Sequence, residues 1–251
     1  YYSWWKNIDK VIFTLIVILF SLGLFFSLAS TSLIASDKLE TNSYFFFFKH
    51  LIYFFIGMFI LIFFSSLSKK NLFRFSIFLF FISLFFLFLV PLVGTEVKGA
   101  KRWLDLMFMP RFQPIELIKP FTIIFLATIL SSEKNIHIYY KYCISFIAIV
   151  PISFLLMIQP DIGQTLLIFF SWVTLVFISG ISLIVFLSFF AISLTSLIYM
   201  VFYIPKFDYI RKRIFSFFNP DIGSHSAQAA KSVDGISSGG FFGKGIGEGT
   251  L

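Results

Sequence analysis

Charged residues are scarce in this chain. Asp, Glu, Lys and Arg make up 13% of its 251 residues, about half the share found in soluble domains. Apolar residues make up 59% and occur in runs of about 20, which leaves too little polar surface to cover a water-soluble globule. Segments of roughly ten residues with alternating polarity, typical of membrane β-barrels, are absent. The composition therefore predicts an all-α polytopic membrane protein.

The chain also has little cysteine and histidine. Cys143 is its only cysteine, which excludes a disulfide within the chain and a cysteine-based metal cluster. His50, His137 and His225 are too scattered to indicate a metal site. We expect no cofactor, with a divalent cation left open. We also expect no nucleic-acid partner, because the net charge of +8 comes from cations in the short segments between apolar runs.

The apolar runs have the length of membrane crossings. About 20 helical residues, each rising about 1.5 Å, cross about 30 Å of hydrocarbon. Seven segments fit, near 11–30, 44–67, 75–94, 113–132, 143–159, 163–180 and 182–204. Residues 1–204 then form a transmembrane bundle, and 205–251 form an extracytoplasmic loop. The first run lacks a small-residue cleavage site, so we expect a signal anchor in a chain truncated at both ends.

Cations between the runs predict the orientation. Those on one side are Lys6, Lys10, Lys69, Lys70, Arg74, Lys134 and Lys141. The positive-inside rule makes that side and the N-terminus cytoplasmic. The loop 95–112, the turn 159–163 and the tail then lie outside. The outer side is also rich in cations, either because later loops tolerate them or because they bind an anionic headgroup.

The fourth crossing must contain charges. Only residues 120–132 separate Lys119 from Glu133, and about 20 Å of helix cannot span the bilayer. The crossing therefore includes Gln113, Glu116 and Lys119, which a three-residue spacing places on one helix face. An ion at the bilayer centre costs about 2.5 to 3.5 kcal/mol. We expect these side chains to point into the bundle, as a structural ion pair or as part of a substrate path.

Two further segments are candidates for the outer face. Asp161 lies in a tight turn, where its carboxylate could cap the sixth crossing or take part in chemistry beside the basic loops. The glycine-rich run 239–249 has backbone N–H groups that could cradle a phosphate with the help of Lys244. The alternative is that this run is a flexible loop.

Four motifs, in this order, resemble the SEDS family (shape, elongation, division and sporulation) of bacterial cell-wall glycosyltransferases. They are GAKRWL at 99–104, QPIELIK at 113–119, QPDIG at 159–163 and GGFFGKGIG at 239–247. The resemblance covers essentially the whole chain. GEGT at 247–250 and FFFFKH at 45–50 are similar to the divisional FtsW branch in its alphaproteobacterial form, with the RodA elongation branch second.

The resemblance implies a ten-span inner-membrane enzyme that polymerises lipid II at the division septum and releases undecaprenyl pyrophosphate. Its implied partners are a class B penicillin-binding protein of the FtsI type and other divisome membrane proteins. A lipid-linked precursor flippase or transporter and a non-catalytic divisome scaffold are the alternatives. The family's proposed catalytic aspartate follows the glycine-rich loop, beyond Leu251, so we assign no catalytic residue.

The resemblance also suggests residues for the site. The motif positions that carry over as candidates for substrate binding are Arg102, Trp103, Gln113, Glu116, Lys119 and Asp161. Three nearby cations, Lys101, Arg111 and Lys244, complete the predicted set. We expect Arg102, with Lys101 or Arg111, to bind the pyrophosphate, while Glu116 and Lys119 order a polar floor.

Overall fold

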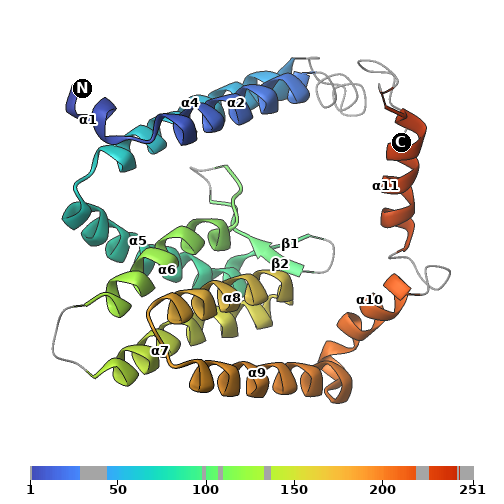
Figure 1. Cartoon of the computed structure of the whole chain (residues 1–251). Coiled ribbons are helices and arrows are strands. Elements are labelled where there is room, and N and C mark those ends of the chain that lie inside the picture. Colours follow the sequence, from blue (N-terminus) through green and yellow to red (C-terminus); the bar gives the residue numbers. More distant parts are fainter. Residues whose placement is uncertain are drawn as a thin grey trace. The chain divides into compact units, whose positions relative to one another are not determined.

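The structure, a computed structural model, describes residues 2–28, 44–97, 100–106, 110–132, 137–218, 226–241 and 243. Helices dominate these residues (Figure 1). The chain divides into two compact units, one of Tyr1–Ser66 with Ser193–Leu251 and one of Leu67–Ile192. The predicted motifs at 99–104, 113–119 and 159–163 all belong to the second unit.

An apolar helix lies at each predicted crossing. The helices are α2 (Lys10–Phe26), α4 (Phe45–Ser66), α5 (Lys69–Val93), α6 (Pro114–Leu130), α7 (Ile138–Ile158), α8 (Ile162–Ile178) and α9 (Leu183–Tyr203). Of these, α4, α5, α7 and α9 are long and apolar enough to cross a membrane. The predicted all-α, multi-pass membrane fold is confirmed. Helices α2, α6 and α8 have 17 residues each, about 25 Å, so the number of seven crossings stays a prediction.

Two helices begin earlier than the apolar runs suggested. Helix α5 begins at Lys69 because the Ser68 hydroxyl caps it by accepting a hydrogen bond from the Asn71 backbone N–H. Helix α7 begins at Ile138 and includes Lys141 in its first turn. Charged residues at a helix end can remain at the membrane surface, so the helices extend past the hydrocarbon-length segments that hydropathy detects.

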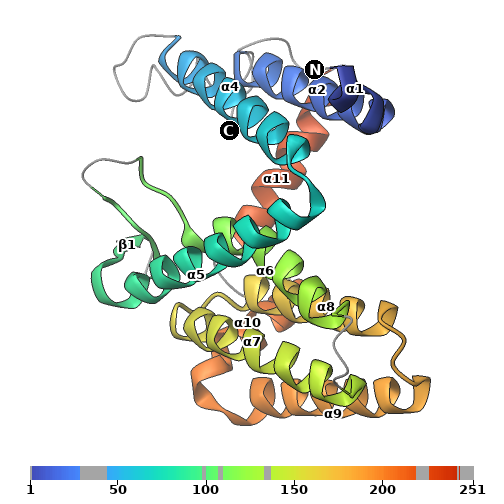
Figure 2. The same ribbon diagram turned by 90° about the vertical axis from the view of Figure 1, so that its left-hand side faces the viewer.

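The second unit is built around the four helices α5, α6, α7 and α8. Helix α6 packs against α5, α7 and α8, and α7 packs against α8; α5 and α6 lie side by side in both views (Figures 1 and 2). Phe80 of α5 stacks on Phe125 of α6 with ring centroids 4.4 Å apart. Side chains that are fully buried in this core include Leu87, Ile118, Leu126, Ile152 and Leu156.

A β-hairpin connects α5 to α6. Strand β1 (Thr95–Val97) pairs antiparallel with β2 (Ala100–Trp103). Gly94 ends α5, and a Cβ at this position would collide with the Val90 carbonyl oxygen, so the turn into the hairpin requires glycine. After β2, Leu104 forms a bridge with Phe112 and is fully buried. The buried Leu104 fixes the end of the strand that carries Arg102.

The first unit contains α1 (Tyr2–Asn7), α2 and α4 at the N-terminal side. Helices α2 and α4 pack together, and the Trp4 indole N–H donates a 3.0 Å hydrogen bond to the Ser65 hydroxyl. The tail contains η2 (Pro205–Phe207), α10 (Asp208–Phe218) and α11 (Ser226–Gly239), where the sequence predicted a loop. Its extracytoplasmic position stays a prediction. Most of the glycine-rich run, with Lys244, lies outside the described residues.

Candidate functional site

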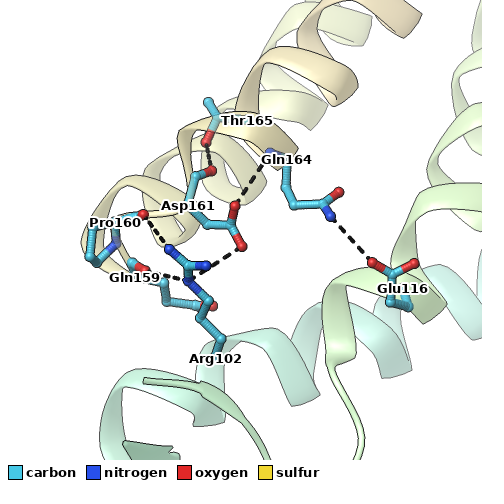
Figure 3. Close-up of polar contacts among 7 residues, drawn as sticks. All are labelled: Arg102, Glu116, Gln159, Pro160, Asp161, Gln164 and Thr165. Carbon is cyan, nitrogen blue, oxygen red and sulfur yellow. Dashed lines mark hydrogen bonds and ion pairs between the residues drawn. The ribbon is translucent and has the colours of Figure 1, made fainter. Parts of the chain in front are cut away.

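Arg102 is bound to the turn between α7 and α8 (Figure 3). Its Nη2 donates a 2.7 Å hydrogen bond to the Pro160 carbonyl, and its Nε donates a 3.3 Å bond to the Gln159 carbonyl. The same Nε lies 3.5 Å from Asp161 Oδ2, and one third of the arginine side chain is exposed. These contacts orient the guanidinium through Nε and Nη2, which leaves Nη1 for a ligand.

Asp161 is the N-cap residue of α8. Its Oδ1 accepts a hydrogen bond from the Gln164 backbone N–H at 3.4 Å, and its backbone carbonyl accepts one from the Thr165 hydroxyl at 2.9 Å. The capping role predicted from the sequence is confirmed. Because the second carboxylate oxygen pairs with Arg102, Asp161 also connects the start of α8 to the hairpin.

Glu116 and Lys119 form the predicted ion pair on α6. Glu116 Oε2 lies 2.7 Å from Lys119 Nζ, three residues along the helix. The sequence predicts that Gln113, Glu116 and Lys119 all point into the bundle. Gln113 and Lys119 are partly buried, and the Lys119 side chain is 22% exposed, whereas the Glu116 side chain is 52% exposed. Glu116 lies in the first turn of α6, where its charge is favoured by the helix dipole and needs no burial.

Gln164 joins the two ion pairs. Its side-chain Nε2 donates a hydrogen bond of 3.3 Å to Glu116 Oε1, and its backbone N–H binds Asp161 (Figure 3). The chain of contacts therefore runs from Arg102 through Asp161 and Gln164 to Glu116 and Lys119. We call these five residues the polar network. They come from β2, the α7–α8 turn, α8 and α6.

The sequence-based prediction did not include Gln164. Asp161 followed three residues later by Gln164 is the capping-box pattern of a helix N-terminus, and this was the available signal. In a capping box the third-position side chain reaches back to the cap. Here the Gln164 side chain binds Glu116 of another helix instead, and no local pattern encodes that choice.

The other predicted site residues lie around the network or apart from it. Lys101 is exposed on β2, next to Arg102, while Trp103 and Gln113 are half-buried. Arg111 pairs with Asp105 through Nη2 at 3.0 Å, and both side chains are about half exposed. Of the two proposed companions of Arg102, Arg111 is already paired with Asp105, whereas Lys101 forms no salt bridge within the part of the chain that the structure describes.

Two further features bear on which ligands the protein could bind. Among the described residues there is no group of three His, Cys, Asp or Glu side chains that could hold a metal ion. A cavity of about 400 Å³ lies among α7, α8 and α9, and its lining includes Tyr142, Trp172 and Phe189 but no residue of the polar network. The network is a partly exposed polar surface and not the wall of this apolar cavity.

The relatives found by sequence comparison share one description. Three proteins described as probable peptidoglycan glycosyltransferase FtsW match over nearly the whole chain. The protein of Buchnera aphidicola is 30% identical over 95% of this chain and 60% of its own length. The protein of Caulobacter vibrioides is 27% identical over 99% of this chain and 62% of its own length. The protein of Coxiella burnetii is 32% identical over 98% of this chain and 66% of its own length. The chain thus spans about 60% of the length of these relatives.

Solved structures show the same similarity. The crystal structure of the Thermus thermophilus rod shape determining protein RodA matches 76% of this chain and 60% of its own, with 27% identity and a TM-score of 0.59. A peptidoglycan synthase complex that coordinates polymerization and crosslinking matches 86% of this chain and 64% of its own, with 26% identity and a TM-score of 0.61. The model of the FtsW, RodA and SpoVE cell cycle proteins matches residues 9–251. The chain therefore belongs to the FtsW/RodA/SpoVE family of cell cycle proteins, the SEDS family that its motifs resemble.

Proposed function

We propose that the protein is a peptidoglycan glycosyltransferase that joins the disaccharide units of lipid II into glycan strands during septal wall synthesis. Family membership and the descriptions of the FtsW relatives support this activity. The structural observation that carries the proposal is the Arg102 guanidinium, held by two carbonyls and Asp161 and still partly exposed.

The reaction places a specific demand on such a site. A sugar hydroxyl attacks the anomeric carbon, a new C–O bond forms, and the bond from that carbon to the diphosphate oxygen breaks. The hydroxyl proton passes to a base, and the diphosphate leaves with additional negative charge. Cationic donors that are already oriented lower the barrier most, because they need no rearrangement as charge develops. The base is not assigned to any described residue.

Arg102 meets this demand. A planar guanidinium binds phosphate oxygens through two parallel N–H bonds, and Nη1 together with the second N–H of Nη2 remains for a ligand. Asp161 opposes the positive charge of Arg102 but also fixes its orientation. Lys101 is exposed beside it on β2 and adds positive charge. Glu116 and Lys119 form a polar floor on α6.

The location and partners of the enzyme are also proposals. We infer that it lies in the bacterial inner membrane with a cytoplasmic N-terminus, so that the polar network faces the outer side where wall is built. A class B penicillin-binding protein of the FtsI type would crosslink the strands. The similarity to a synthase complex that coordinates polymerization and crosslinking supports such a partner. Other divisome membrane proteins would complete the assembly.

Replacing Arg102 tests the proposal directly. In the full-length protein, Arg102→Ala should lower the rate of lipid II polymerisation at least about 100-fold, the effect of losing one oriented donor at a developing charge. Gel analysis of glycan strands made by purified protein in detergent measures the rate. Arg74→Ala is the matched control, because Arg74 lies at the opposite end of α5 from the hairpin, and it should leave the rate unchanged.

The same assay separates the alternatives. A wild-type rate for Arg102→Ala would contradict the phosphate clamp. Glycan synthesis in detergent needs no second compartment, so it distinguishes a polymerase from a flippase, which moves its substrate between two sides. A scaffold would retain septal glycan synthesis in cells even when Arg102→Ala and Glu116→Gln are combined.

A further inference from the structure

One polar atom of the network has no role in the clamp described above. The Gln164 side chain uses Nε2 to bind Glu116, but its Oε1 is buried and accepts no hydrogen bond within the described residues. A buried acceptor without a partner is uncommon and destabilising. Such an atom is satisfied when a bound water or a ligand donates a hydrogen bond to it.

The orientation of this amide is determined by its neighbour. The Glu116 carboxylate also binds Lys119, and as an ionised group it can only accept hydrogen bonds. It must therefore face the N–H₂ end of the Gln164 amide, which points Oε1 away from Glu116 (Figure 3). A ligand at this position must supply a donor.

The chemistry of a lipid-linked disaccharide diphosphate limits what that donor can be. The ionised diphosphate offers acceptors only, and the polyprenyl tail offers neither donors nor acceptors. The sugar headgroup carries hydroxyl and acetamido N–H donors. A sugar is bonded directly to the diphosphate, and Gln164 lies in the first turn of α8, beside the Asp161 that holds Arg102. A diphosphate on Arg102 would therefore bring its sugar to this turn.

We propose that Gln164 is a sugar-binding residue whose Oε1 accepts a hydrogen bond from a hydroxyl or acetamido N–H of the headgroup. This inference rests on the proposed function, because it takes the diphosphate to bind at Arg102. The side chain is partly exposed, and the terminal torsion of glutamine rotates in a broad energy well. A small rotation therefore opens Oε1 to the ligand while Nε2 stays near Glu116.

Binding measurements with two ligands test the proposal. The full-length protein is titrated with lipid II and with undecaprenyl pyrophosphate, which has the diphosphate and tail but no sugar. Gln164→Met has a similar size but no acceptor oxygen, so it should weaken lipid II binding about fivefold to tenfold, the effect of one neutral hydrogen bond. Its affinity for undecaprenyl pyrophosphate should stay within about twofold. Arg102→Ala should weaken the binding of both ligands.

A control variant on the same helix removes a hydrogen bond that lies outside the polar network. The Ser171 hydroxyl donates to the Leu167 carbonyl within α8, and the Ser171→Ala variant should bind both ligands like the wild type. Gln164→Leu serves as a second variant if Gln164→Met elutes as an aggregate in size-exclusion chromatography.

Two results would overturn the sugar contact. One is unchanged lipid II affinity in both Gln164 variants. The other is an equal loss for both ligands, which indicates that Gln164 only supports the phosphate clamp. Either result leaves the proposed function intact as long as the wild type polymerises lipid II and Arg102→Ala does not. A wild type that neither binds nor polymerises lipid II would overturn the proposed function itself.

Discussion

Single residues of the polar network have more than one task. Asp161 caps α8 with one carboxylate oxygen and pairs with Arg102 through the other. The cap depends on an oxygen that can accept a backbone N–H, whereas the pair depends on negative charge. Asparagine is as good a cap as aspartate but carries no charge, so two substitutions at this one position can separate the tasks.

Asp161→Ala should lower the free energy of unfolding by about 1 kcal/mol, because the first turn of α8 loses its cap. Asp161→Asn should keep most of that stability, since its side-chain oxygen still accepts the Gln164 N–H. Thermal unfolding of the purified protein in detergent measures the difference. If both variants lose the same amount of stability relative to the wild type, the charge pair with Arg102, and not the cap, stabilises the start of α8.

At the scale of elements, a buried hydrogen-bond chain fixes α8 against α7. The Trp172 indole N–H donates to the Ser145 hydroxyl at 2.9 Å, and that hydroxyl donates to the Tyr142 carbonyl at 2.8 Å. Ser145 is fully buried and Trp172 is 4% exposed. Hydropathy alone identifies both helices, but it does not detect this bond, which adds a specific polar contact to the apolar packing of α7 against α8.

Ser145→Ala should destabilise the protein by about 1 to 3 kcal/mol, because the buried Trp172 N–H loses its acceptor. Adding Trp172→Phe removes the unpaired indole N–H. The loss of unfolding free energy in the double variant should therefore be smaller than the sum of the losses in the two single variants. Unfolding curves for the four proteins of this cycle give the coupling. Strict additivity would mean that the bond contributes nothing to α7–α8 packing.

At the scale of the whole molecule, the positions of charge along the chain predict which ends of the helices share a membrane side. The β-hairpin and the α7–α8 turn are joined by Arg102 and so lie at one end of their unit. The junction between α4 and α5, with Lys69 and Lys70, is at the opposite end of α5. The positive-inside rule assigns that opposite end to the cytoplasm.

Cysteine labelling tests this orientation. In a Cys143→Ser background, Glu96→Cys places a thiol on the exposed β1 strand, and Lys70→Cys places one at the start of α5. A membrane-impermeant maleimide should label Glu96→Cys in intact spheroplasts and Lys70→Cys only after the membrane is permeabilised. The reverse pattern would invert the proposed topology and place the polar network on the cytoplasmic side.

Much of the fold could be predicted because its signals are local. Long apolar runs become helices wherever they occur, since their backbone groups must be satisfied internally in a membrane. The Glu116–Lys119 pair was equally predictable, because a three-residue spacing places two side chains on one helix face. The positions of helix ends were predicted less accurately, because caps such as Ser68 depend on individual hydrogen bonds that hydropathy does not detect.

The sequence by itself determined that this is a multi-pass helical protein of the SEDS family, and it predicted Arg102, Glu116, Lys119 and Asp161 as candidate site residues. Only the tertiary structure decided how these residues are joined. Arg102 donates hydrogen bonds to carbonyls that lie 57 and 58 residues away in the sequence, and Gln164 donates one to Glu116 across 48 residues. Such contacts depend on which helix faces pack together, and that choice is made by the whole core at once and not by any local pattern.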